Sequence, residues 1–148
     1  PFCGYNMGDY FNHWLARGEK AEASKLPRIF FVSWFRKNED GKFVWPGFGD
    51  NARVLKWISE RIDGEAEAVD TPVGRTPAPG ALDLSGLSLS DADLATLLEG
   101  DADVWSEEAA LIPAVYEKFG ERLPKTLWGQ HEALVKRLDA KRAAVAAE

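Results

Sequence analysis

The residues best suited to bind a ligand lie between positions 30 and 51, where the sequence reads FFVSWFRKNEDGKFVWPGFGDN. Phe48 stands between Gly47 and Gly49, a poor arrangement for core packing because glycine offers no side chain and costs backbone entropy. Glycine does let a backbone approach a ligand closely. A base stacked on an aromatic side chain gains about 1–3 kcal/mol per contact. This pattern therefore predicts a slot for a planar ligand such as a purine.

Hydrogen bonds must then choose between purines, because stacking does not distinguish guanine from adenine. Guanine presents an O6 acceptor and an N2 donor, whereas adenine presents an N6 donor. The amide of Asn51 carries both a donor and an acceptor. We expect this amide, together with the backbone of the glycine-rich loop, to read the edge of the base.

Core packing is the competing interpretation of the same aromatic residues, since strand aromatics usually face a layer of helices. For Phe30, Trp34 and Trp45 the core interpretation is favoured, because most large apolar side chains are buried for packing.

The chain carries few of the groups that catalysis requires. It has no phosphate-binding loop of the G-x-x-x-x-G-K-[ST] type. Its two histidines, His13 and His131, lie far apart in the sequence, and no cluster of His, Cys and carboxylates has metal-ligand spacing. Cys3 has no evident histidine partner, and Ser33 falls in an expected strand rather than in a nucleophile elbow. We therefore expect no catalytic residue and no metal ligand in this chain.

Composition narrows the class of protein further. The chain has 148 residues, 45% of them hydrophobic, with six Trp and eight Phe, so it can bury a core. Its net charge of −6 argues against a nucleic-acid partner. The single cysteine excludes an internal disulfide and fits a cytoplasmic protein, and no apolar run approaches the roughly 18 residues that span a membrane. Because the chain opens at Pro1 without an initiator Met, we expect a fragment of a longer protein.

The aromatic segment itself is predicted to form a β-hairpin. Residues 28–34 are rich in β-branched and aromatic side chains and are bounded by Pro27, which is typical of a strand. Residues 38–41 indicate a turn with Gly41 in the left-handed region, and residues 42–45 indicate the returning strand.

Helices are predicted around this hairpin from apolar spacing and capping signals. Asp50 is expected to cap one helix, Ser90 and Asp93 form a capping box for another, and Pro113 is expected to kink or restart a third. Residues 64–82 predict a connector. The expected helices cover residues 7–17, 51–63, 90–98, 101–116 and 124–147. The predicted fold is α/β, in the form of an α+β fragment whose short hairpin and glycine-rich loop are covered by helices.

Several segments carry a family resemblance. They read PFCGYN at 1–6, WFRK at 34–37, FVWPGFGDNARVL at 43–55, TPVG at 71–74 and ALDLSGL at 81–87. In this order and spacing they closely resemble the C-terminal region of the GTP-dependent phosphoenolpyruvate carboxykinases, and the W-P-G-F-G-[DE]-N string is highly specific. Beyond about Leu87 only the helical pattern matches. Cys3 and Ser33 replace residues common in the family.

The resemblance implies part of the C-terminal lobe of a two-lobed enzyme, with residues 1–87 as its guanine-nucleotide-binding part and residues 88–148 as a helical subdomain. It implies conversion of oxaloacetate and GTP into phosphoenolpyruvate, CO₂ and GDP in gluconeogenesis, with Mn²⁺ and Mg²⁺. The family's metal ligands and phosphate loop precede the equivalent of Pro1. The isolated chain is therefore expected to be inactive, and its partner is the remainder of a cytoplasmic, monomeric carboxykinase.

For the site, the resemblance implies that guanine lies between Phe35 and Phe48, with Phe43 at its edge. It implies that Asn51 helps to read the base and that Phe2 lies near phosphoenolpyruvate. These residues would bind and orient GTP or GDP rather than make bonds.

Two other functions remain open on the residues alone. The chain could be a stand-alone module that binds a nucleotide or a peptide through its aromatic loop. It could also be a structural domain with an aromatic core, which predicts no exposed ring near Gly47 and Gly49.

Overall fold

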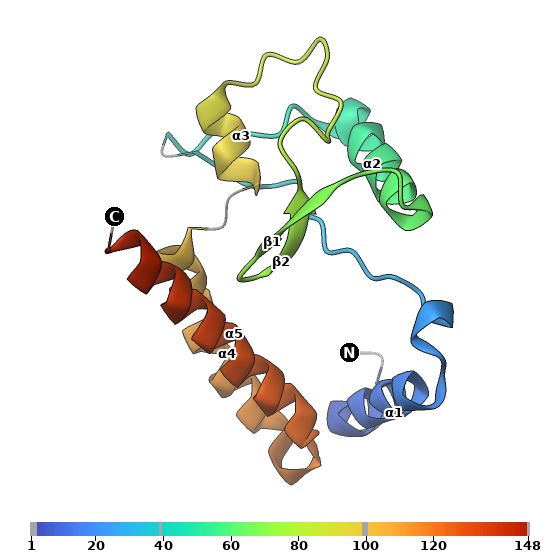
Figure 1. Cartoon of the computed structure of the whole chain (residues 1–148). Helices are drawn as coiled ribbons and strands as arrows, with labels where there is room; N and C mark the ends of the chain where they lie inside the picture. Colours follow the sequence, from blue (N-terminus) through green and yellow to red (C-terminus); the bar gives the residue numbers. More distant parts are fainter. Residues whose placement is uncertain (1–2, 39, 99–100, 148) are drawn as a thin grey trace. The chain divides into compact units, whose positions relative to one another are not determined.

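The computed structural model describes residues 3–38, 40–98 and 101–147, which form two compact units (Figure 1). The first unit combines the described chain up to Pro27 with the chain from Ala102 onward, and the second is the chain between them. No helix among these residues has the length and apolar character needed to cross a membrane.

The first unit is helical and is built around a pair of helices. Helices α4 (Ala102–Tyr116) and α5 (Lys125–Val145) lie side by side (Figure 1). Ala109 of α4 and Leu138 of α5 are buried, and the rings of Tyr116 and Trp128 meet at 5.1 Å between centroids. The elements of this unit are α1 (Met7–Lys20), α4 (Ala102–Tyr116), α5 (Lys125–Val145) and two 3₁₀ helices, η1 (Ala23–Lys25) and η3 (Glu117–Arg122).

Helix α1 is fastened to η3 although about a hundred residues separate them in the sequence. The Asn6 side chain accepts a hydrogen bond from the Gly8 N–H at 2.7 Å and donates one to the Phe119 carbonyl at 3.3 Å. Arg122 pairs with Asp9 at 2.9 Å. Gly8 is buried against the backbone of Arg122, and an added Cβ would lie 2.6 Å from the Arg122 carbonyl carbon. The absence of a side chain at Gly8 is therefore what allows this close approach.

The second unit mixes helices with one small sheet. Trp57 of α2 (Asn51–Asp63) is buried and donates its indole N–H to the Glu67 carbonyl at 3.2 Å. Val44 and Trp45 are also buried, and the Phe30 ring packs edge-on against Trp57. The elements are η2 (Phe48–Asp50), α2 (Asn51–Asp63), β1 (Ala68–Thr71), β2 (Gly74–Pro77) and α3 (Asp91–Leu98).

The strands are not where the sequence predicted them. Residues 28–34 and 42–45 form no strand, and the expected hairpin is reduced to its turn and a single bridge between Lys37 and Phe43. Strands occur instead in the expected connector, where β1 and β2 pair antiparallel in a register that runs from Ala68 opposite Pro77 to Thr71 opposite Gly74. A strand needs a partner, and within the described chain nothing pairs with residues 28–34. The fold is therefore mostly helical with one two-stranded hairpin, so the α/β prediction is correct only in part.

The helix predictions are confirmed, with shifts at the ends. Ser90 and Asp93 form the expected capping box: the Ser90 hydroxyl accepts from the Asp93 N–H at 3.1 Å, and the Asp93 carboxylate accepts from the Ser90 N–H at 3.2 Å. The prediction for Asp50 is wrong, because its side chain makes no cap and instead accepts from Arg53. Pro113 starts no new helix but lies inside α4.

Candidate functional site

Phe35 and Phe43 are brought together by the turn that separates them. The bridge between Lys37 and Phe43, with a hydrogen bond of 2.9 Å from the Val44 N–H to the Arg36 carbonyl, holds residues 36–37 beside residues 43–44. The two phenyl rings then meet edge-on, 6.1 Å between centroids at 66°. Both rings are largely exposed, Phe35 at 73% and Phe43 at 59%. This pair is an apolar surface that is open to a planar ligand.

Lys37 adds a positive charge to the same pair. Its ammonium nitrogen lies 5.1 Å from the centroid of the Phe43 ring, within the range of a cation–π contact. The site thus combines aromatic faces with a cation.

Phe48 is presented by the loop that leads into α2. Gly47 has φ 141° and ψ −171°, a conformation that side chains rarely adopt, and its carbonyl accepts from the Asp50 N–H at 3.1 Å. An added Cβ at Gly47 or Gly49 would meet nothing within 4 Å, so Gly47 is required for the backbone conformation and not for space. Phe48 is 91% exposed, and within the described residues no other ring contacts it.

Asn51 is the first residue of α2, and its side chain is bonded to Trp45. The Trp45 indole donates to Asn51 Oδ1 at 2.9 Å. Trp45 is only 7% exposed and its ring lies 6.1 Å from that of Trp34. The expected core position of Trp45 is confirmed, and the indole holds the amide predicted to read the base.

Arg53 ties the glycine-rich loop to a distant segment, and the sequence analysis did not identify it. Its guanidinium donates to Asp50 Oδ1 at 3.0 Å and to the Asp83 carbonyl at 2.8 Å. The Asp83 carboxylate in turn accepts from the Ser85 hydroxyl at 2.6 Å and from the Ser85 N–H at 3.1 Å. These hydrogen bonds from Ser85, with the charge of Arg53, lower the pKa of Asp83. The three-residue spacing of Asp50 and Arg53 in the sequence was the available signal.

The structure therefore brings Phe35 to Phe43 and Asn51 to Trp45, whereas Phe48 stands apart from these contacts. Phe2, expected near phosphoenolpyruvate, lies outside the described residues. Within the described chain, no group of three or more His, Cys, Asp or Glu residues could hold a metal ion.

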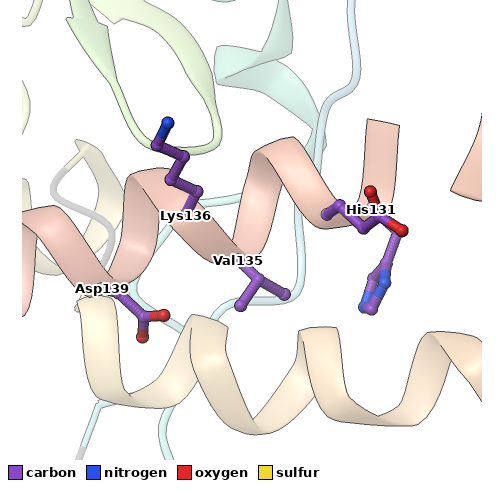
Figure 2. Close-up of a pocket in the computed structure, with 5 residues that line it drawn as sticks. His131, Val135, Lys136 and Asp139 are labelled. Carbon is purple, nitrogen blue, oxygen red and sulfur yellow. The ribbon is translucent and has the colours of Figure 1, made fainter. Parts of the chain in front are cut away.

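Two open hollows elsewhere on the chain involve none of the predicted base-binding residues. One, of about 370 Å³, lies along α5 and is lined by His131, Glu132, Val135, Lys136 and Asp139 (Figure 2). His131 turns toward α4, where its Nε2 lies 2.9 Å from the Ala109 carbonyl (Figure 2). The other, of about 360 Å³, lies between the end of α2 and the segment after β2. The three phenylalanines predicted to bind a base are therefore described by their exposed rings.

Comparison with known proteins identifies the class. A family model described as the phosphoenolpyruvate carboxykinase C-terminal P-loop domain matches residues 1–137. The phosphoenolpyruvate carboxykinase (GTP) of Neocallimastix frontalis is 52% identical over 141 residues, which are 95% of this chain and 23% of that protein. That of Arthrobacter sp. (strain FB24) is 50% identical over 138 residues, covering 93% of this chain and 23% of that protein. That of Treponema pallidum subsp. pallidum is 48% identical over 140 residues, covering 94% of this chain and 23% of that protein.

The match defines a carboxykinase C-terminal domain over most of the chain. The chain belongs to the GTP-dependent phosphoenolpyruvate carboxykinase family. It spans about a quarter of the length of these curated relatives.

Proposed function

We propose that this chain supplies the guanine-binding part of the nucleotide site of a phosphoenolpyruvate carboxykinase. The parent reaction converts oxaloacetate and GTP into phosphoenolpyruvate, CO₂ and GDP, in a cytoplasmic, gluconeogenic enzyme. The observation that carries the proposal is the exposure of Phe35, Phe43 and Phe48 in one unit, where apolar rings of this size are usually buried.

The role of these residues is positioning. Phe35 and Phe48 stack on the two faces of the base, Phe43 contacts its edge and Asn51 reads its hydrogen-bonding groups. A base held in this way aligns the phosphates that it carries, which lowers the entropic part of the reaction barrier. Chemistry at the phosphates belongs to residues outside this chain.

The family resemblance implies Mn²⁺ and Mg²⁺ in the parent enzyme. Among the described residues no cluster of metal-ligating side chains is present, so we propose that residues outside this chain hold these ions. The chain also has no G-x-x-x-x-G-K-[ST] loop that could bind the phosphates of GTP.

One residue supports the proposal over the structural alternative. A domain whose aromatic residues all form a core is expected to have no exposed ring beside Gly47 and Gly49, whereas Phe48 is 91% exposed in this chain.

Tryptophan fluorescence of the 148-residue chain tests the proposal, with GDP and ADP as parallel ligands. Trp45 lies two positions after Phe43 in the sequence and is hydrogen-bonded to Asn51, so its emission should report an occupied site. We expect a saturable response to GDP at lower concentration than to ADP. Equal responses, or none to either nucleotide at millimolar concentration, would overturn the proposal for this chain.

A matched pair of variants separates stacking from general loss of apolar surface. Phe48→Ala removes the proposed stacking ring, and Phe31→Ala removes another phenylalanine of the same unit that is also 91% exposed. Stacking contacts of about 1–3 kcal/mol correspond to a loss of GDP affinity of about fivefold to 150-fold for Phe48→Ala. Phe31→Ala should leave the affinity unchanged, and equal losses in both variants would argue against a specific slot.

A further inference from the structure

The hydrogen bond between Trp45 and Asn51 suggests how the site distinguishes two purines. We propose that Trp45 is a positioning residue that locks the Asn51 amide in one orientation and thereby selects guanine over adenine. This inference rests on the proposed function, in which Asn51 faces the base.

The donor chemistry of the indole fixes the orientation of the amide. An asparagine side chain has nearly the same shape when its oxygen and nitrogen exchange places, so its orientation follows from its partners. The Trp45 Nε1–H is a donor only, and it lies 2.9 Å from Asn51 Oδ1. In the exchanged orientation two N–H donors would face each other, and a part-buried donor would lose its acceptor, which is costly. The oxygen must therefore stay on the side of the indole.

The indole itself is held firmly. Trp45 is buried, its ring packs on Trp34, and the neighbouring Val44 is buried as well. Asn51 is fixed at its backbone because it is the first residue of α2. Neither partner can move aside easily, so the bond acts as a lock.

With Asn51 Oδ1 bonded to the indole, the side chain of Asn51 offers a ligand only its Nδ2 donor group. Within the described part of the chain, no acceptor is bonded to Asn51 Nδ2, so the amide offers two N–H donors. Guanine and adenine differ at position 6 of the ring, where guanine has an oxygen acceptor and adenine an amino donor. An amide free to turn matches either purine, and it pairs with both N6 and N7 of adenine. An amide locked as a donor matches guanine O6 and opposes the amino group of adenine.

Removing the indole N–H tests the lock directly. Trp45→Phe keeps an aromatic ring in the core and deletes the donor, so the amide can turn. We expect the ratio of ADP to GDP dissociation constants, measured by isothermal titration calorimetry on the full chain, to fall about tenfold, the scale of one well-placed base contact. A variant that keeps the ratio of the unaltered chain would overturn the inference.

Trp57→Phe is the matched control. Trp57 is as deeply buried as Trp45, lies in the same unit and also donates its indole N–H, but to the Glu67 carbonyl. The Trp57→Phe variant loses a comparable amount of packing but leaves the contact of Asn51 unchanged. Its nucleotide preference should stay that of the unaltered chain, and an equal fall in both variants would mean that selectivity follows general packing and not the lock.

A second variant keeps the inference testable if Trp45→Phe does not fold. Asn51→Asp retains an oxygen for the Trp45 indole but replaces the free donor with an acceptor. We expect it to lose GDP affinity and to bind ADP at least as well as GDP. Unchanged preference for GDP would refute the assigned donor role of Nδ2.

The measurements also separate this inference from the proposed function. If the unaltered chain shows no preference for GDP, the proposed function fails and the lock fails with it. If the unaltered chain prefers GDP, Asn51→Asp loses that preference and Trp45→Phe keeps it, the site stands and only the lock is wrong. If Asn51→Asp also keeps the preference for GDP, the base-reading role of Asn51 in the proposed function fails together with the lock.

Discussion

Replacing Gly8 by alanine in α1 has two opposite effects on stability: a gain in helix propensity and a steric clash. Gly8 lies in the first turn of α1, where helix propensity alone favours alanine over glycine by about 1 kcal/mol. The structure indicates the opposite result. An added Cβ would lie 2.6 Å from the Arg122 carbonyl carbon and 2.9 Å from Asn6 Oδ1, and a backbone carbonyl cannot turn away as a side chain can.

The size of this loss of stability depends on how far the Arg122 backbone and the Asn6 side chain must move to make room for the Cβ. Overpacking of this kind costs about 1–3 kcal/mol. Displacing Asn6 also removes the helix cap that it provides to the Gly8 N–H, which is worth about 1 kcal/mol. After the gain in propensity, the net expectation for Gly8→Ala is a loss of about 2 kcal/mol in the free energy of unfolding.

Gly18 provides the internal control on the same helix. An added Cβ there meets nothing within 4 Å, so Gly18→Ala should stabilise the chain by up to about 1 kcal/mol. Urea unfolding followed by circular dichroism measures both variants. A Gly8→Ala chain as stable as the unaltered one would refute the close contact between α1 and Arg122.

Two further predictions concern burial and pH. Leu138 is 1% exposed, so Leu138→Ala should lower the free energy of unfolding by about 2–5 kcal/mol. As a control, Val145→Ala on the exposed end of α5 should change the free energy of unfolding by less than about 0.5 kcal/mol. Equal effects of the two variants in urea unfolding would count against the α4–α5 core. Hydrogen bonds from Ser85 lower the pKa of Asp83 in the folded chain. The stabilisation from the Asp83 carboxylate should therefore be present above its unfolded pKa and disappear as the pH falls through the lower folded value. Ser85→Ala should raise the pKa of Asp83 measured by NMR titration, and no change would exclude that cause.

The elements that the sequence predicted well are those set by local spacing. The capping box at Ser90 and Asp93 and the helix from Asn51 depend on residues three or four positions apart, so the sequence carries their full description. Strands depend on a partner that the sequence does not name. Residues 29–35 alternate between exposed and half-buried as a strand would, yet nothing in the described chain pairs with them. The strands that form, AVDT and GRTP, were missed because they are short and largely polar.

The candidate site divides in the same way. The glycine-flanked Phe48 is visible in the sequence because its neighbours are unusual. The bond from Trp45 to Asn51 and the double anchor of Arg53 depend on how side chains turn across a loop. Residue spacing does not determine that direction, so the sequence alone could not predict these contacts.

The fastening of α1 to η3 has a consequence for the order in which the chain folds. Its hydrogen bond from Asn6 to Phe119 and its ion pair between Asp9 and Arg122 each join residues 113 positions apart. The second unit, in contrast, is one continuous stretch of chain. During synthesis from the N-terminus, that stretch can form its own contacts before Phe119 and Arg122, the partners of α1, have been synthesised. We therefore expect the contacts between α1 and η3 to form after the second unit has folded. The folded second unit then shortens the flexible chain between α1 and η3, which lowers the entropy cost of forming these contacts.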